Sequence, residues 1–265
     1  MVITVADESE FDGLRRREMR RSLTARVARA ATVGTAGLAL LALVSGCSEH
    51  RATGQVPPAQ QLASEPGSAS PRPLVEGSPT LLAPGTYQLA YHLAADEELP
   101  DAYVDIPSGF DEAATWYVVS HDRQEFLGLW TVSAADRDAC RRGAHDAYDP
   151  GPTVENLADA LVAQKSTRAS TPEPVSLAGY HGLYVELASP QDLRTCGPEP
   201  GLWTSGPTGG RGIYGDGQVD LVWILDMDGQ RIVVNASYSP RSTAADIYKL
   251  NSMVESLQFA PAAQE

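Results

Sequence analysis

Three consecutive residues, Ser120, His121 and Asp122, have the side-chain types of a hydrolytic triad. In such a triad the histidine takes the serine proton and the carboxylate orients the histidine, so the side chains converge from separate parts of the fold. Consecutive residues do not converge in this way, and the sequence lacks the Gly-x-Ser-x-Gly turn that presents the serine of many hydrolases. We therefore expect a strand end that runs into a turn here, and we assign no catalytic residue.

A second candidate for chemistry is Asp226-Met227-Asp228-Gly229, whose two carboxylates could bind calcium. A calcium loop needs further oxygen ligands and a bidentate glutamate at a fixed spacing, and the sequence has none there. Asp228-Gly229 is instead a residue pair that favours a two-residue type I′ turn. The pattern predicts a hairpin of residues 219–226 and 231–238, and we predict no metal or cofactor site.

The expected hairpin has a self-consistent register. With a two-residue turn, six apolar side chains share one face, and Asp226 stands opposite Arg231 as a pair of opposite charges. The paired apolar positions are Leu225 with Ile232, Trp223 with Val234, and Leu221 with Ala236.

Residues 201–217 are rich in glycine but lack the Gly-Lys-Ser/Thr of a phosphate-binding loop. We predict a long, mobile surface loop. It carries Trp203, Arg211 and Tyr214, and exposed loops with aromatic side chains often form binding surfaces. These three residues are the candidate partner-binding site of the chain.

The N-terminal region has the order of a bacterial export signal. Seven arginines precede an apolar stretch, residues 30–44, and the small residues Ser45 and Gly46 then precede Cys47. The stretch is shorter than the roughly 20 residues that span a bilayer. The order resembles a lipoprotein signal, which implies that residues 1–46 are removed and that Cys47 carries diacylglycerol. The alternative is an uncleaved helix with an incidental cysteine.

The start of this signal is open to two interpretations. Residues 1–18 include five acidic residues, which export signals usually avoid, so the true start is plausibly Met19. The pair Arg20-Arg21 also allows twin-arginine export, although Ser22-Leu23-Thr24 matches that signal poorly. Either route would place the mature protein on the outer face of the cytoplasmic membrane, where two or three acyl chains give a stable anchor.

Cys140 and Cys196 are the two cysteines that remain after Cys47. An exported protein meets an oxidising compartment, and neither residue has a partner at the Cys-x-x-Cys spacing of metal sites. We predict a Cys140–Cys196 disulfide, which the chain-entropy model values at roughly 4 kcal/mol.

The charge of the chain excludes some partners. The formal net charge is −14, and without residues 1–46 it becomes −16, from 29 acidic and 13 basic residues. A surface this acidic repels nucleic acid and anionic lipid headgroups. The covalent lipid on Cys47, and no basic patch, would therefore hold the protein at the membrane.

Composition also sets the domain limits. Residues 47–80 hold six prolines, three glycines and five serines, with few large apolar side chains, which predicts a disordered tether. Residues 81–262 have the length of one domain, and 263–265 form a tail. Short strands are predicted at 86–92, 102–106, 115–120, 125–133 and 183–187, with helices after Thr153 and after Ser242 or Thr243. The fold class is α+β, an antiparallel sheet with helices packed on it.

Several segments of residues 98–262 resemble exported domains of actinobacteria. They are Gly151-Pro152-Thr153-Val154, Gly179-Tyr180-His181-Gly182, Trp223 to Gly229, and Ser256-Leu257-Gln258-Phe259. The chain is also similar, more distantly, to the PsbP/Mog1-like sandwich of LpqN-type mycobacterial lipoproteins. This resemblance implies an antiparallel sheet flanked by helices and implies no activity.

Three functions remain open from the sequence. The leading one is a non-enzymatic lipoprotein whose domain binds an envelope protein, a glycan or a lipid-like ligand. The second is an envelope hydrolase whose residues are scattered along the chain. The third is a sensory or regulatory module of a membrane system. A cavity would favour ligand binding, and a buried histidine–carboxylate contact beside a serine would favour the hydrolase.

Overall fold

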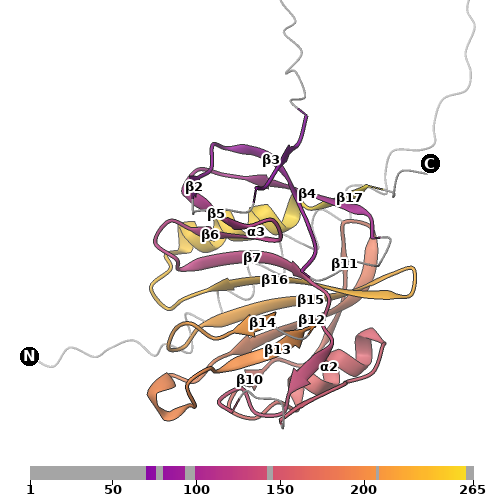
Figure 1. The fold of residues 1–265 in the computed structure, drawn as a ribbon, viewed down its shortest axis with the longest axis vertical. Helices are drawn as coiled ribbons and strands as arrows, with labels where there is room; N and C mark the ends of the chain where they lie inside the picture. Colours follow the sequence, from indigo (N-terminus) through magenta and orange to yellow (C-terminus); the bar gives the residue numbers. More distant parts are fainter. Residues whose placement is uncertain (1–69, 76–79, 93–98, 142–145, 207–208, 261–265) are drawn as a thin grey trace, which may run out of the picture. The chain divides into compact units, whose positions relative to one another are not determined.

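A nine-stranded antiparallel sheet forms the centre of the computed structural model (Figure 1). The structure describes residues 70–75, 80–92, 99–141, 146–206 and 209–260, which belong to one compact unit. The strand order of the central sheet is β10-β12-β15-β16-β7-β6-β5-β2, and β11 pairs with β12 as well. Its strands are β2 (Thr80–Leu81), β5 (Phe110–Ala114), β6 (Tyr117–Ser120), β7 (Glu125–Trp130), β10 (Arg168–Ala169), β11 (Glu173–Leu177), β12 (Tyr180–Ala188), β15 (Val219–Met227) and β16 (Gln230–Tyr238).

The hairpin of β15 and β16 has the predicted register. Leu225 pairs with Ile232, Trp223 with Val234, and Leu221 with Ala236. Asp228 and Gly229 both have the positive φ of a type I′ turn, 55° and 91°. Both faces of the hairpin are buried, because β15 and β16 lie in the middle of the sheet and are covered on two sides.

One detail of the hairpin differs from the prediction. Asp226 stands opposite Arg231 in the register, but the two side chains form no ion pair. Asp226 accepts a hydrogen bond from the Gly229 amide, and Arg231 donates to the carbonyl oxygens of Val132 and Thr153. Backbone groups next to each side chain therefore take the place of the expected partner.

One face of the central sheet is covered by α2 (Val154–Val162) and by a second sheet of order β14-β13-β8-β9. Thr153 caps α2 in a capping box with Asn156, as its position in the sequence predicts. Leu157 and Leu161 of α2 pack with Val222 and Ile224 of β15 in one apolar cluster. The second sheet consists of β8 (Ala134–Asp136), β9 (Ala147–Tyr148), β13 (Gly201–Ser205) and β14 (Gly209–Gly212).

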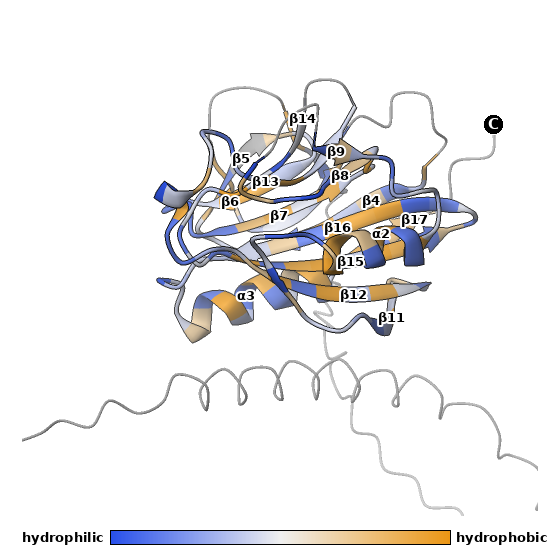
Figure 2. Ribbon diagram, turned by 90° about the horizontal axis from the view of Figure 1, so that it is seen from below, coloured by the Kyte–Doolittle hydropathy of each residue, from blue (hydrophilic) through white to orange (hydrophobic). Residues whose placement is uncertain are grey.

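The opposite face is covered by α3 (Ala244–Glu255), which contacts β7 and β16 (Figure 2). Thr243, one of the two expected caps, begins this helix, and Ile247, Leu250 and Val254 are buried as the apolar spacing predicts. A third sheet of order β1-β3-β4-β17 lies at this end. It consists of β1 (Arg72–Pro73), β3 (Gly85–Leu89), β4 (Asp101–Ile106) and β17 (Gln258–Ala260).

The folded part begins before residue 81, so the expected boundary of the tether is too late. Arg72 and Pro73 pair with β3, and the Leu74 side chain is buried. Arg72 also donates to the carbonyl oxygens of Ala83 and Pro84. A strand of two residues that contains proline carries no periodic pattern, which is why composition placed it in the tether.

The described residues are richer in strands than the expected α+β description conveys. They contain mostly antiparallel strands with two α-helices, one on each side of the central sheet, and a short 3-10 helix at Leu193–Thr195. The α+β class is correct in broad terms. This arrangement covers the β12–β15 part of one sheet face with α2 and leaves the β6–β7 part to other elements.

Candidate functional site

A pocket of about 770 Å³ lies over the β6–β7 part of the central sheet. Its floor comes from β6, β7 and β16, and the edge strand β14 and the loop that follows it form another side. This volume is within the range of about 300–1,000 Å³ that is usual for small-molecule sites. The lining residues are His92, Trp116, Tyr117, Val119, Arg123, Gln124, Glu125, Phe126, Trp130, Gly209, Gly210, Arg211, Tyr214, Gly215, Asp216, Gln218, Ser237, Ser239, Pro240 and Arg241.

The aromatic residues of the pocket form one connected group. The Trp116 ring centroid lies 4.3 Å from those of His92, Tyr117 and Trp130. Tyr117 stacks on Phe126, with centroids 5.3 Å apart. Such edge-to-face and stacked pairs stabilise one another by about 0.5–1.5 kcal/mol each. The rings therefore form a rigid wall.

The alternation of side chains along two paired strands builds this wall. Phe126 and Trp130 point to the same side of β7, and register places Tyr117 of β6 opposite Gly128. A Cβ atom at position 128 would lie 2.7 Å from the Phe126 ring and 3.0 Å from Cβ of Tyr117. Glycine at this position therefore makes the room that the two stacked rings occupy.

A buried polar network lies below the pocket. Asp220 of β15 accepts hydrogen bonds from Arg211 (Nε to Oδ1, 2.9 Å), Gln218 (2.7 Å) and Asn235 (3.1 Å). Arg211 also donates to the Ser237 hydroxyl at 2.6 Å. The side chains of Arg211 and Asp220 are 2% and 0% exposed, so this ion pair is fully removed from water. It fastens β14 to the central sheet.

Arg211 also orders the aromatic side chains above it. Its guanidinium carbon lies 4.2 Å from the Phe126 ring centroid and 5.7 Å from that of Tyr214. Burial is the main cause that raises the pKa of the Tyr117 phenol, followed by the nearby Tyr214, while Arg123 and Arg211 oppose the rise. All four residues line the same pocket.

Two arginines at the rim are exposed. Arg123 follows β6 in a left-handed backbone conformation with φ of 59°, and Arg241 follows β16. Arg241 donates to Gln124 Oε1 at 3.1 Å. Neither guanidinium forms an ion pair with another residue of the part that the structure describes. The rim therefore presents two guanidinium groups without an ion-pair partner among the described residues, beside the exposed carboxylate of Asp216.

Two polar atoms of the wall have no protein partner among the described residues. They are the indole Nε1 of Trp130 and the imidazole Nδ1 of His92. Burial lowers the pKa of His92, so its ring favours the neutral form. Both atoms are enclosed by the protein itself, so they add no exposed hydrogen-bonding group to the wall.

The three residues expected in a partner-binding loop have different positions. The prediction of a long irregular loop over residues 201–217 is wrong, because β13 and β14 occupy most of it. Trp203 is fully buried and packs against Trp130, and Arg211 is held by Asp220. Tyr214 is 79% exposed and lines the pocket. Three of the glycines that indicated a loop instead form the edge strand β14 together with Arg211.

Most of the pocket was missed at the sequence level. Trp116, Tyr117, Phe126 and Trp130 lie on segments that were expected to be strands, and Phe126 and Trp130 are an even number of residues apart. This spacing could have placed them on one face. The pairing of β6 with β7, which brings all four together, is a long-range property that the strand patterns do not contain.

Ser120, His121 and Asp122 lie at a strand end and turn, as expected. The Ser120 hydroxyl donates to Asp122 at 2.8 Å and accepts from the amides of Gln124 and Glu125. His121 contacts Asp111 at 3.1 Å, with a side chain that is 78% exposed. The hydrogen bonds of the Ser120 hydroxyl therefore stabilise the turn, which indicates a structural role for this residue.

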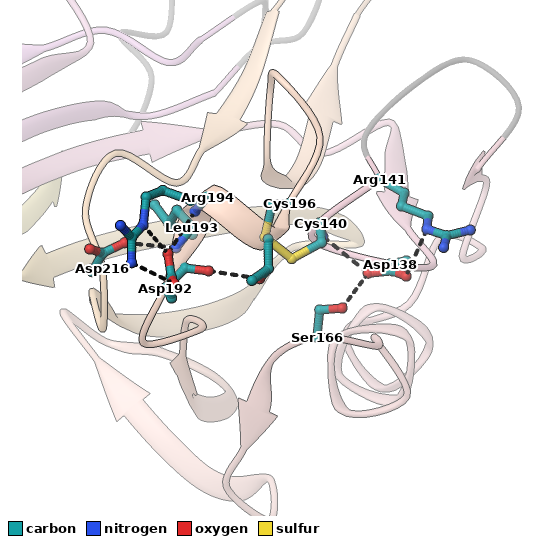
Figure 3. The surroundings of a disulfide bond; sticks show 10 residues. Asp138, Cys140, Arg141, Ser166, Asp192, Leu193, Arg194, Cys196 and Asp216 are labelled. Atoms are coloured by element: carbon teal, nitrogen blue, oxygen red, sulfur yellow. Dashed lines mark hydrogen bonds and ion pairs between the residues drawn. A yellow bond between two sulfur atoms is a disulfide. The ribbon is translucent and has the colours of Figure 1, made fainter.

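The predicted disulfide between Cys140 and Cys196 is present, with Cα atoms 4.4 Å apart (Figure 3). It joins the segment after β8 to the end of the 3-10 helix, and the Gly197 amide donates to the Cys140 carbonyl at 2.7 Å. Asp192 caps that helix and pairs with Arg194. The disulfide therefore fastens the second sheet at the end that does not form the pocket.

The lipid-attachment residue Cys47 and the tail 263–265 lie outside the described residues. Within the part of the chain that is described, neither helix has the length and apolar character needed to cross a membrane.

No protein-family model and no curated protein matches the chain. Among solved structures, the chain is weakly similar to cyanobacterial PsbP (CyanoP) from Synechocystis sp. PCC 6803. The TM-score is 0.32 at 12% identity, over 69% of this chain and 96% of that one. It is also weakly similar to LpqN of Mycobacterium tuberculosis, which is described as involved in cell envelope biogenesis. There the TM-score is 0.29 at 13% identity, over 70% of this chain and 86% of that one.

At these low TM-scores the two similarities carry no argument about family, fold or function.

Proposed function

We propose that this protein is an extracytoplasmic lipoprotein, anchored through Cys47, whose aromatic pocket binds a ligand of the cell envelope without transforming it. The observation that carries the proposal is the pocket itself. Its wall is aromatic, its rim carries two exposed arginines, and the buried Arg211–Asp220 ion pair lies in the polar network below it. A pocket that is largely pre-formed, with few polar groups at fixed places, is the usual form of a binding site.

The rigidity of the pocket supports binding as its role. Its wall and floor lie on β6, β7 and β16, and the Arg211–Asp220 pair holds β14 in place. Rigid strands lose little conformational entropy when a ligand binds, so more of the contact energy becomes affinity. The exposed Tyr214 is the member of the wall that a ligand would contact first.

The location rests on the N-terminal sequence. Arginines, a short apolar stretch and Ser45-Gly46-Cys47 have the order of a lipoprotein signal. A Cys140–Cys196 disulfide fits an oxidising compartment outside the cytoplasm. Acyl chains on Cys47 would hold the domain at the outer face of the cytoplasmic membrane, where envelope material is within its reach.

A hydrolase at Ser120, His121 and Asp122 is less well supported by the geometry. Ser120 donates its hydroxyl proton to Asp122, whereas a nucleophilic serine donates to a histidine. The His121–carboxylate contact is at the surface, where water competes for it. A sensory role would use the same pocket, with ligand binding as its first step.

Ligand binding is testable with the full chain in a zwitterionic detergent that contains no sugar. Soluble fragments of the envelope of the producing cell are titrated in, and the fluorescence of Trp116 and Trp130 reports their arrival in the pocket. Tyr214→Ala should weaken the apparent affinity by at least about tenfold, or about 1.4 kcal/mol. The matched control is Tyr248→Ala, because Tyr248 is 70% exposed on α3 and outside the pocket.

Two results would contradict this function. Identical titrations of the wild type and both tyrosine variants would place any binding elsewhere. If catalytic amounts of the protein progressively shorten the fragments, as monitored by chromatography, the protein is an enzyme and not a binding protein.

A further inference from the structure

We propose that the ligand is an acidic carbohydrate, whose sugar ring stacks on the aromatic wall and whose anionic group binds Arg123 and Arg241. This inference rests on the proposed function and gives it a ligand class.

The wall suits a ring with an apolar face. Trp116 and Tyr117 are half-buried, and Tyr214 is exposed, so each offers part of a ring to a ligand. The face of an aromatic ring carries partial negative charge, and the C–H bonds on one face of a sugar carry partial positive charge. Sugars therefore stack on such rings, and so do hydrocarbon chains and flat aromatic compounds.

The polar side chains of the lining favour the sugar over a hydrocarbon chain. Gln124, Ser237 and Ser239 line the same pocket as the aromatic rings. An acyl chain lying over them would take their polar atoms out of water without offering hydrogen bonds. Sugar hydroxyls both donate and accept, so one ligand can stack on the rings and bond such groups.

Two exposed arginines favour a negatively charged ligand. Arg123 and Arg241 line the pocket and form no ion pair within the described part of the chain. Arg211 is not available for this purpose, because Asp220 already neutralises it. The lining also carries two carboxylates: Asp216, which accepts a backbone hydrogen bond, and Glu125, which is buried on β7. Guanidinium groups bind carboxylates and phosphates through two parallel hydrogen bonds, which a neutral sugar cannot provide.

The edge strand adds a further sugar-compatible surface. β14 is the terminal strand of its sheet, and Gly209 and Gly210 line the pocket without side chains. A Cβ at position 209 would meet the His92 ring at 2.3 Å, so glycine lets strand and wall approach closely. Gly209 and Gly210 therefore present backbone and not side chains to a ligand.

The test uses matched pairs of ligands with the full chain in sugar-free detergent, measured by isothermal titration. One pair is digalacturonic acid and its dimethyl ester, which share the rings and differ in charge. A second pair is sucrose 6-phosphate and sucrose. This pair tests whether a phosphate can serve as the anionic group of the ligand in place of a carboxylate. We expect digalacturonic acid or sucrose 6-phosphate to bind at least about tenfold more tightly than its own neutral partner.

The arginine variants locate that preference. Arg123→Gln together with Arg241→Gln should reduce the preference for the acid to nearly one, with little effect on the neutral partner. The matched control is Arg194→Gln, which removes a charge that is 88% exposed and outside the pocket. Thermal melting of each variant confirms that the fold is kept.

Each outcome tests a different part of the proposed ligand assignment. Equal binding of acid and neutral partner would overturn the anionic requirement and leave the pocket's function intact. No binding of any sugar, while envelope fragments still alter the fluorescence, would overturn the carbohydrate class alone. If neither sugars nor fragments bind, the proposed function falls as well. A preference that survives the double arginine variant would place the anion elsewhere and overturn the assignment to the rim.

Discussion

The two halves of one face of the central sheet are covered by different elements. Over β12 and β15, Leu157 and Leu161 of α2 close the face with aliphatic side chains that leave no polar atom to satisfy. Over β6 and β7 the same face ends in aromatic rings and exposed arginines. The sheet is continuous, so the difference lies in the covering element. A helix completes the core on one side, and an edge strand leaves a pocket on the other.

The largest effect should come from the pair that holds the edge strand over the pocket. Asp220→Asn leaves Arg211 buried without a charge partner, which typically costs about 3–5 kcal/mol. Chemical denaturation measures the free energy of unfolding. Asp192→Asn is the control, because it removes the carboxylate of the exposed Asp192–Arg194 pair and should change stability much less. Equal losses in both variants would contradict the role given to the buried pair.

Next in size is a change in the helix-covered half. Leu161→Ala removes a fully buried side chain from the core and should cost about 2–5 kcal/mol. Ligand affinity should stay unchanged at temperatures where the variant is folded, because Leu161 is not part of the pocket. Val162→Ala, at the exposed neighbouring position, is the control for helix propensity. Loss of binding in the folded Leu161 variant would show that the two halves are coupled.

A smaller change tests how the aromatic wall is packed. Gly128→Ala places a Cβ 2.7 Å from the Phe126 ring, and overpacking of this kind costs about 1–3 kcal/mol. The Phe126 ring must move, so both stability and ligand affinity should fall. Gly215→Ala is the control for stability, because a Cβ at that position meets no atom within 4 Å and its φ is not in the left-handed region. Unchanged fluorescence and affinity in the Gly128 variant would show that the wall is looser than described.

The smallest effect concerns pH. Burial lowers the pKa of His92 in the folded protein below its ordinary value of about 6.5, so the unfolded chain binds a proton more readily. The stability contributed by His92 is present above that value and is lost as pH falls below it. His92→Gln should therefore differ from the wild type more at about pH 7.5 than at about pH 5.5 in the free energy of unfolding. A difference that does not vary with pH would contradict this.

The two halves were also unequally predictable from the sequence. Thr153 and the spacing of Leu157 and Leu161 predicted α2, and the Asp228-Gly229 turn predicted the hairpin register, because caps, periodicity and turns are local. The disulfide followed from the export signal and the number of cysteines. Each of these inferences needs only neighbouring residues or a count.

The pocket half depends on information that is not local. Glycine at 209, 210 and 212 indicated a loop, yet Arg211 finds Asp220 and Ser237 across the sheet, and these bonds make the segment a strand. Trp203 was expected to be exposed, but a partner 73 positions earlier, Trp130, buries it. Long-range pairing of this kind overrides local preference and cannot be derived from composition.

If the pocket binds envelope material, Tyr214 contacts that material in the living cell. A photo-reactive phenylalanine analogue at position 214 should form adducts with non-protein envelope material on illumination, seen by mass spectrometry of the purified chain. The same analogue at position 248, which is also exposed but lies on α3, should not. Adducts of the same mass and yield at both positions, or none at position 214, would contradict ligand binding in the pocket.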